Sequence, residues 1–167
     1  RVHSARRSRG VPLLRVREPA RLDQQGDDAA AEAGQNGHIL GTLLEREQKR
    51  RDQALQECRE LERQAQAAQG QVQTLQDYRV EYQQRWSNQF QQSAPIEILR
   101  CYHGFVGRLD QAIGAQQGVA RQAEARWQAG RERLRQRELK LATVKRLIER
   151  RQQALRLVAD RREQKLS

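Results

Sequence analysis

Apolar side chains recur at alternating spacings of four and three residues along two long stretches of the chain. In the first stretch, the apolar members of this register are Leu40, Leu44, Ala54, Cys58, Leu61, Ala65, Ala68, Val72, Leu75, Tyr82 and Trp86. In the second stretch they are Leu99, Tyr102, Val106, Leu109, Ile113, Ala120, Ala123, Trp127, Leu134, Leu141, Val144, Ile148, Leu155 and Val158. The other positions of the register hold polar residues or glycine, namely Glu47, Arg51, Arg79, Gln116, Gly130, Arg137 and Arg151. A period of 3.5 residues maintained over this length indicates helices whose apolar seams face a partner helix.

A short segment with a proline separates the two stretches. We expect a first helix over about residues 39–91, a turn at residues 92–95, and a second helix from Pro95 to about residue 165. Ser93 is a suitable capping residue, and proline is favoured at the first position of a helix. Because two helices joined by a short connection fold back on one another, the sequence predicts an all-α fold, a long antiparallel two-helix coiled coil or helical hairpin. If the turn centres on residue 93, the numbers of facing residues should add to about 186.

The N-terminal residues 1–37 differ from the rest of the chain. Residues 1–22 are rich in arginine and contain two prolines, and residues 23–33 are acidic and rich in alanine. The Gly-Gln-Asn-Gly sequence at residues 34–37 predicts a break in any helix. We therefore expect residues 1–37 to be a disordered extension, and residues 38–167 to form the hairpin domain.

The composition limits where function can reside. Charged residues make up 32 % of the chain and aromatic residues only 4 %, so too little is apolar to fill a compact core. No run of residues is apolar enough to cross a membrane. The two cysteines, Cys58 and Cys101, do not make a disulfide framework, and a reducing compartment fits them best. The surfaces of the hairpin, rather than a pocket, are the expected functional parts.

Charge is concentrated towards the C-terminus. Residues 39–120 carry ten basic and ten acidic side chains, whereas residues 121–167 carry fifteen basic and six acidic ones, a net +9 of the formal +11. A basic helical end can bind nucleic acid, an anionic membrane surface or an acidic protein cavity. The aromatic residues expected of a single-strand binder are missing after Trp127. In the expected pairing residue 39 faces residue 147, so Leu155 and Val158 continue the seam without a partner helix, which predicts a partner from another protein or else a frayed terminus.

Two aromatic residues, Tyr78 and Phe105, lie one position off the seam. Each belongs to a row of residues spaced by four, three and four along one side of its helix. The antiparallel pairing places the two rows at the same height, so that they form one surface, which we call the stripe: Gln71, Leu75, Tyr78, Tyr82, Phe105, Leu109, Ala112 and Gln116. An aromatic, partly apolar surface of this kind is typical of a binding hot spot, although both rings could instead seal the flank of the seam. Gly104, Gly107, Gly114 and Gly118 lie around the second row and would either admit a partner closely or reflect compositional drift.

The sequence contains no catalytic constellation. The three histidines, His3, His38 and His103, do not have the spacing of metal ligands, and no phosphate-binding glycine loop or nucleophile motif is present. We therefore expect a protein that is not an enzyme and that has neither a cofactor nor a bound metal.

The two rows and the turn between them resemble the flagellar export protein FliJ family. That family has the pattern Q-x3-L-x2-Y-x3-Y on one helix and F-x3-L-x2-A on the next, as in the stripe. The segment from Leu109 to Ile113 is similar to the family's L-x-x-A-I, and Trp127 followed by Arg133 and Leu134 fits its W-then-RL spacing. The resemblance extends from about Gly34 to the end of the chain. Gln116 stands where the family pattern has a histidine, so a pH-dependent role at this position is not expected.

The resemblance implies a cytoplasmic component of the flagellar type III export apparatus, peripherally associated with the inner membrane and similar to the central stalk of rotary ATP synthases. It implies that the stripe binds the export gate protein FlhA, that the end holding both termini binds the hexameric export ATPase FliI, and that export chaperones are further partners. On this resemblance we expect the ATPase ring to contact Leu40, Leu43, Leu44, Arg150, Arg151, Leu155, Arg156, Val158, Arg161 and Arg162. A stalk of a virulence-type secretion system would have a nearly identical sequence pattern. The alternatives are a basic nucleic-acid-binding helical protein and a generic coiled-coil scaffold.

Overall fold

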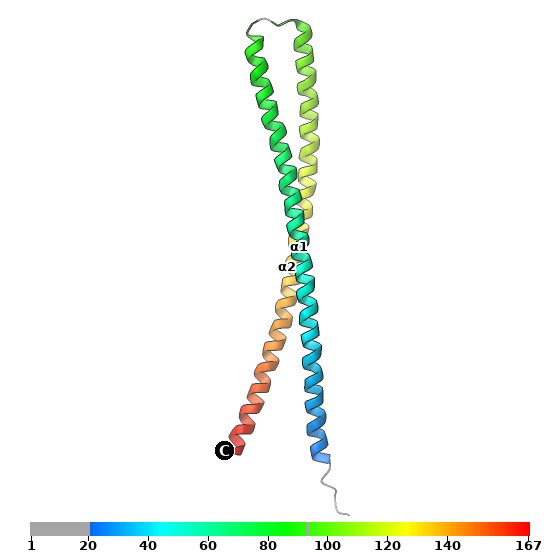
Figure 1. Cartoon of the computed structure of the whole chain (residues 1–167), viewed down its shortest axis with the longest axis vertical. Coiled ribbons are helices and arrows are strands. Elements are labelled where there is room, and N and C mark those ends of the chain that lie inside the picture. The colour runs from blue at the N-terminus through cyan, green and yellow to red at the C-terminus, as the bar shows by residue number, and fades with distance from the viewer. Residues whose placement is uncertain (1–20, 93) are drawn as a thin grey trace, which may run out of the picture. The chain divides into compact units, whose positions relative to one another are not determined.

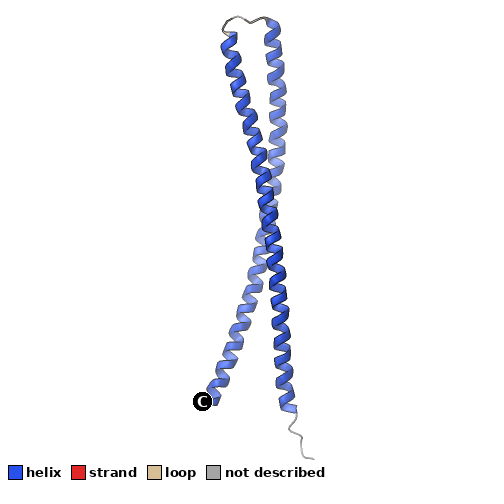
Figure 2. Ribbon diagram, viewed as in Figure 1, coloured by secondary structure: helices blue, strands red, loops and turns tan. Residues whose placement is uncertain are grey.

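The structure is a computed structural model that describes residues 21–92 and 94–167, with side chains from residue 25 onwards. Two α-helices are present in these residues, α1 (Arg21–Phe90) and α2 (Ile96–Leu166), and the described part of the chain contains no strand (Figures 1 and 2). The chain divides into two units, Arg1–Ile39 and Leu40–Ser167. The second unit is an antiparallel helical hairpin, which confirms the predicted all-α fold.

The first helix begins earlier than the sequence predicted. Residues 34–37 are helical, and α1 extends back to Arg21, so the expectation of disorder is incorrect for residues 21–37. Residues 1–20, the other part of that prediction, lie outside the described residues. The physical reason is that a glycine inside a helix costs about 1 kcal/mol relative to alanine, a penalty that does not by itself end the helix. The alanine-rich residues 29–33 and the packed seam beyond residue 40 favour helix on both sides of the two glycines.

The turn differs from the prediction by one residue. Pro95 is the residue that caps α2 rather than its first helical residue, with φ −58° and ψ 146°. Its carbonyl oxygen accepts the first helical hydrogen bonds, from the amide nitrogens of Ile98 (3.1 Å) and Leu99 (3.3 Å). Ser93, the predicted capping residue, lies outside the described residues. Glu97 lies in the first turn of α2, where its carboxylate opposes the positive end of the helix dipole.

Burial along the hairpin follows the predicted register. Every register position from Leu40 to Trp86, and from Leu99 to Arg151, is buried or half-buried, including the positions that hold charged residues. Val72 is the least exposed core residue, at 2 %. A seam between only two helices covers each side chain incompletely, because no third element closes over it. Beyond Arg151 the register positions Leu155 and Val158 are exposed.

Two polar contacts between the helices show which residues of the antiparallel arms face each other. Arg79 on α1 forms an ion pair with Asp110 on α2, and the side chains of Gln71 and Gln116 are hydrogen-bonded. The residue numbers of these pairs add to 189 and 187, close to the predicted 186. The predicted pairing of the two arms is therefore correct to within about one helical turn.

Small residues allow the two helices to approach closely along the middle of the hairpin. Ala68, Val72 and Ala120 form one buried cluster. Gly130 is buried as well, and a Cβ atom added to it would lie 2.8 Å from Leu61 Cδ1 and 3.7 Å from Cys58 Cα. At Gly107, in contrast, an added Cβ atom would meet nothing within 4 Å.

These two glycines should respond in opposite ways to a side chain. We expect Gly107→Ala to raise the free energy of unfolding by up to about 1 kcal/mol, because it removes the helix penalty of glycine without a clash. We expect Gly130→Val to lower it by about 1–3 kcal/mol, because the larger side chain must displace Leu61 or separate the helices. Thermal unfolding followed by circular dichroism tests both. Equal stability of Gly130→Val and the unmodified chain would mean that α1 and α2 do not pack closely at this level.

Candidate functional site

The structure brings the two halves of the stripe together. The ring centroids of Tyr82 on α1 and Phe105 on α2 lie 4.4 Å apart, and those of Tyr78 and Phe105 lie 6.3 Å apart in an edge-to-face arrangement. At the other end of the stripe, Gln116 Nε2 donates to Gln71 Oε1 at 2.8 Å. All eight stripe residues therefore belong to one face of the hairpin at one height, as their spacing predicted.

Exposure varies across the stripe. Tyr78 is 47 % exposed, and Gln71 and Ala112 are exposed as well. Leu109 beneath them is buried, and Leu75 is half-buried. The stripe therefore consists of accessible side chains supported by residues of the seam. Such a surface is rigid, because the seam residues cannot move without loosening the hairpin.

An aromatic cluster extends from the stripe towards the turn. It consists of Tyr78, Tyr82, Trp86, Phe90, Tyr102 and Phe105. Tyr82 and Tyr102 are stacked with centroids 5.6 Å apart, and Phe90 meets Tyr102 edge-on at 5.2 Å. Sequence reasoning assigned these residues one by one to seam or stripe and missed the cluster. The signal was the spacing of four residues from Tyr78 through Phe90.

The cluster changes the interpretation of Phe105. Its ring is half-buried and contacts two tyrosines of the other helix. Phe105 therefore closes the flank of the seam in addition to presenting an edge to solvent. Tyr78, which is more exposed, contributes less to the packing.

The glutamine at the position of the family's histidine links the two helices. Gln116 Nε2 lies 2.8 Å from Gln71 Oε1 and 3.5 Å from the carbonyl oxygen of Ala68. An amide keeps the same charge at all accessible pH values. This contact between the helices is therefore independent of pH.

The glycines around the second row are not required by the fold of the hairpin. A Cβ atom at Gly104, Gly107 or Gly114 would meet nothing within 4 Å, and at Gly118 it would meet only the end of the Arg121 side chain at 3.9 Å. Close packing inside the chain therefore explains none of the four. At Gly130, which the sequence pattern presents only as a gap in the register, an added Cβ atom would instead lie 2.8 Å from the end of the Leu61 side chain.

The residues expected to contact an ATPase ring lie at the end of the hairpin opposite the turn. Leu40, Leu43, Leu44 and Arg151 are half-buried, and the exposed members are Arg150, Leu155, Arg156, Val158, Arg161 and Arg162. Leu155 is 50 % exposed and Val158 46 %. The sequence argument for this surface assumed that the first helix begins near residue 39, and that assumption is corrected by the start of α1 at Arg21. The structure still shows that Leu155 and Val158, which occupy seam positions, are exposed.

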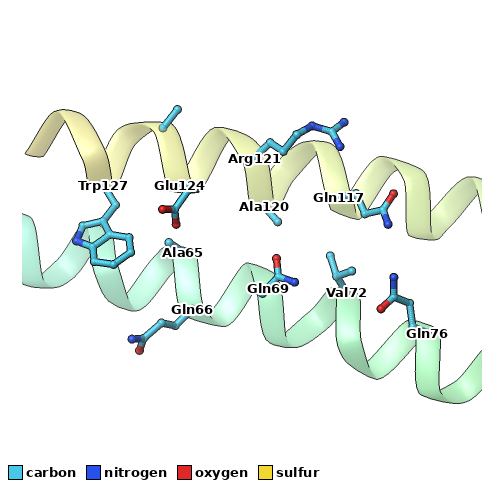
Figure 3. Close-up of a pocket in the computed structure, with 11 residues that line it drawn as sticks. Ala65, Gln66, Gln69, Val72, Gln76, Gln117, Ala120, Arg121, Glu124 and Trp127 are labelled. Carbon is cyan, nitrogen blue, oxygen red and sulfur yellow. The ribbon is translucent and has the colours of Figure 1, made fainter.

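A groove of about 940 Å³ lies between α1 and α2 (Figure 3). The heptad positions of its lining residues Gln69, Gln76 and Gln117 place it on the face opposite the stripe. Its floor is made by small seam residues, Ala65, Val72 and Ala120, and glutamine amides line its sides. Trp127 lies at one end, and the Arg131 guanidinium lies 5.4 Å from the centroid of its ring. The groove exists because small side chains leave the space between the helices unfilled. Its lining offers hydrogen bonds and apolar contact but no nucleophile or paired carboxylates.

The described residues also include ionisable side chains and two thiols. The described part of the chain has no group of three or more His, Cys, Asp or Glu side chains able to hold a metal ion. The shifted pKa values belong to surface ion pairs: hydrogen bonds from Arg63 and Arg135 lower the pKa of Glu60 and Glu132, respectively. The hydrogen bond to Asp110 raises the pKa of Arg79. Cys58 is buried on the seam and Cys101 is exposed, both with free thiols.

A helix long and apolar enough to cross a membrane is not found within the described residues.

Comparison with known proteins gives a family. Residues 37–167 match the family described as Flagellar FliJ protein, which covers most of the chain and all of the hairpin beyond Leu40. Comparisons with curated proteins and with solved structures found no match. The match confirms the resemblance to this family that the sequence indicated. The chain therefore belongs to the flagellar FliJ family and is a component of flagellar protein export.

Proposed function

We propose that this protein is a stalk that couples the export ATPase FliI to the export gate protein FlhA. The observation that carries the proposal is the stripe, whose two halves come from different helices and form one surface on a hairpin of the FliJ family. A second, separate surface lies at the opposite end of the same hairpin. A rod with one binding surface near the turn and another near its termini suits a protein that bridges two assemblies.

The stripe is the surface that would contact the gate protein. Its exposed members surround a tyrosine that is 47 % exposed and rests against Phe105. A tyrosine of this kind offers a large contact area at a low cost in conformational entropy, which is typical of hot spots. The seam beneath it supplies a support that does not rearrange on binding.

The end opposite the turn would contact the ATPase ring. Leu155 and Val158 keep the register of the seam but are exposed, so that an apolar cavity could cover them. Arginines 150, 156, 161 and 162 surround them and could pair with acidic groups of the ring. The bridging role places the protein in the cytoplasm, peripherally associated with the inner membrane through the gate. Handling of export chaperones is a further activity that the resemblance implies, and we assign no residues to it.

Nucleic-acid binding is the second candidate function, because residues 121–167 carry a net charge of +9. It is less well supported than the stalk. The aromatic residue of this region, Trp127, is half-buried and covered by Arg131, so it offers no free face for a base.

Truncation tests the terminal surface. A chain ending at Ile148 loses Leu155, Val158 and the five arginines that follow Ile148 but keeps the paired seam positions up to Ile148. We expect it to retain a cooperative hairpin, seen by circular dichroism, and to lose stimulation of the ATPase ring. Gate binding serves as the control and should be unchanged. If the truncated chain stimulates the ring as well as the full chain, the docking surface lies elsewhere.

Alanine substitutions test the stripe. Tyr78→Ala should cost about 1–3 kcal/mol of gate affinity with little change in melting temperature, because Tyr78 is an exposed aromatic anchor. Phe105→Ala, Leu75→Ala and Leu109→Ala should lower both affinity and melting temperature, because those residues also pack in or beside the seam. Gln69→Ala, an exposed position on the opposite face, is the matched control and should change neither. The proposal fails if Tyr78→Ala melts much earlier yet binds the gate normally, because the stripe would then be packing alone.

A further inference from the structure

A second groove, of about 360 Å³, lies between α1 and α2 in the half of the hairpin away from the turn. Its charged lining residues are Arg50 and Glu57 from α1, with Arg133, Arg137 and Lys140 from α2. Two glutamines and an alanine complete it. Four cations thus converge on a space that contains a single carboxylate.

The positive charges of the groove are only partly compensated. Arg133 Nη2 donates to Glu57 Oε1 at 2.9 Å, and Arg50 Nη1 donates to Glu47 Oε1 at 3.2 Å. Arg137 and Lys140 form no ion pair or hydrogen bond with any described residue. Both charges are therefore available to an external anion.

Arg137 is the more informative of the two. It stands at a position of the seam register and is half-buried. A charge partly removed from water without a partner is unfavourable, and an apolar side chain would stabilise the seam better. A ligand carboxylate would supply the missing partner.

The groove lies on the same face as the stripe. Glu57 and Arg50 precede Gln71 by two and three heptads, and Arg133 and Lys140 follow Ala112 by three and four heptads. Residues separated by whole heptads lie on one side of a coiled-coil helix. The groove is therefore a continuation of the stripe face, with Glu57 about 21 Å from Gln71 along the helix axis.

We propose that this basic groove binds an acidic segment of a partner protein, whose carboxylates pair with Arg137 and Lys140. The ion pair of Glu57 with Arg133 is an internal example of the same contact. The two glutamine side chains, Gln53 and Gln136, can hydrogen-bond the peptide backbone of the bound segment.

A phosphate-bearing ligand fits the groove less well. Phosphate sites generally use the free amide groups of a helix N-terminus or a glycine-rich loop, and every groove residue lies in the interior of α1 or α2. Glu57 would repel a doubly charged phosphate more strongly than a singly charged carboxylate of a peptide. The lining contains no aromatic residue on which a base could stack.

The test uses the full chain and a fluorescein-labelled hexaglutamate peptide, with binding measured by fluorescence anisotropy. The double variant Arg137→Gln/Lys140→Gln should bind the peptide about tenfold more weakly, because two charge-assisted contacts are lost. The control is Lys145→Gln/Arg146→Gln, which removes two exposed positive charges outside the groove and should change affinity by no more than about twofold. Arg137→Leu should lose affinity while its melting temperature rises, which separates loss of the site from loss of the fold.

Three results would overturn the proposal. Equal losses in the two double variants would indicate diffuse attraction to a basic helix. Tighter binding of inorganic tripolyphosphate than of hexaglutamate, abolished by Arg137→Gln/Lys140→Gln, would make the groove a phosphate site. Unchanged affinity in Arg137→Leu would remove the residue on which the argument depends. None of these measurements involves the gate or the ATPase ring, so the outcome is independent of the proposed stalk function.

Discussion

The single seam between α1 and α2 is the constraint on which the rest of the hairpin depends. Both helices have only each other to pack against, so each apolar residue is covered from one side and even Val72 keeps 2 % of its surface exposed. A seam of this kind creates no enclosed cavity, and its stability is spread along a line of contacts. Binding surfaces must then lie on the two flanks of the seam, where side chains from both helices meet.

The composition of the seam changes along the hairpin. Near the turn the seam is flanked by the aromatic cluster, which holds the helices together through ring contacts. In the half away from the turn the register holds Glu47, Arg51 and Arg137, and Glu47 is buried with its Oε2 atom lacking a hydrogen-bond partner. Buried charges of this kind weaken packing compared with apolar residues of similar size. The two halves of the hairpin are therefore held together by different contacts, aromatic rings near the turn and seam residues such as Leu141 and Val144 away from it.

Sequence reasoning predicted the seam well because its signal is repeated at every heptad. The charged residues Glu47 and Arg79 do not obscure the register, because the apolar seam residues before and after each of them still indicate it. The start of α1 has no repeated signal of this kind. Two glycines and an asparagine at residues 34–37 suggested a break, but the helix continues through them. Two glycines of α2, Gly107 and Gly130, show the same limit of prediction from sequence. A Cβ atom added at Gly130 would lie 2.8 Å from Leu61 Cδ1 and one added at Gly107 would meet nothing within 4 Å, a difference that the sequence does not reveal.

The position of the stripe could be predicted from the sequence, but the contacts among its side chains could not. Spacing alone placed Tyr78 and Phe105 at one height, because an antiparallel pairing follows from the position of the turn. It could not reveal that Phe105 touches both Tyr78 and Tyr82, since the direction of a side chain depends on how closely the helices approach. The basic groove was hidden for the same reason. Arg50 and Arg137 are far apart in the sequence, and a charged residue on the seam looks like an exception until its neighbours are known.

The separation of the two proposed binding surfaces constrains how one could influence the other. Leu40 and Tyr78 are 38 residues apart on α1, which corresponds to about 57 Å along a continuous helix. A shift of a single side chain is not transmitted over this distance, because the contacts along the seam are independent and no shared core connects the two surfaces. Coupling between an ATPase ring and a gate would therefore require the hairpin to rotate, tilt or bend as a body.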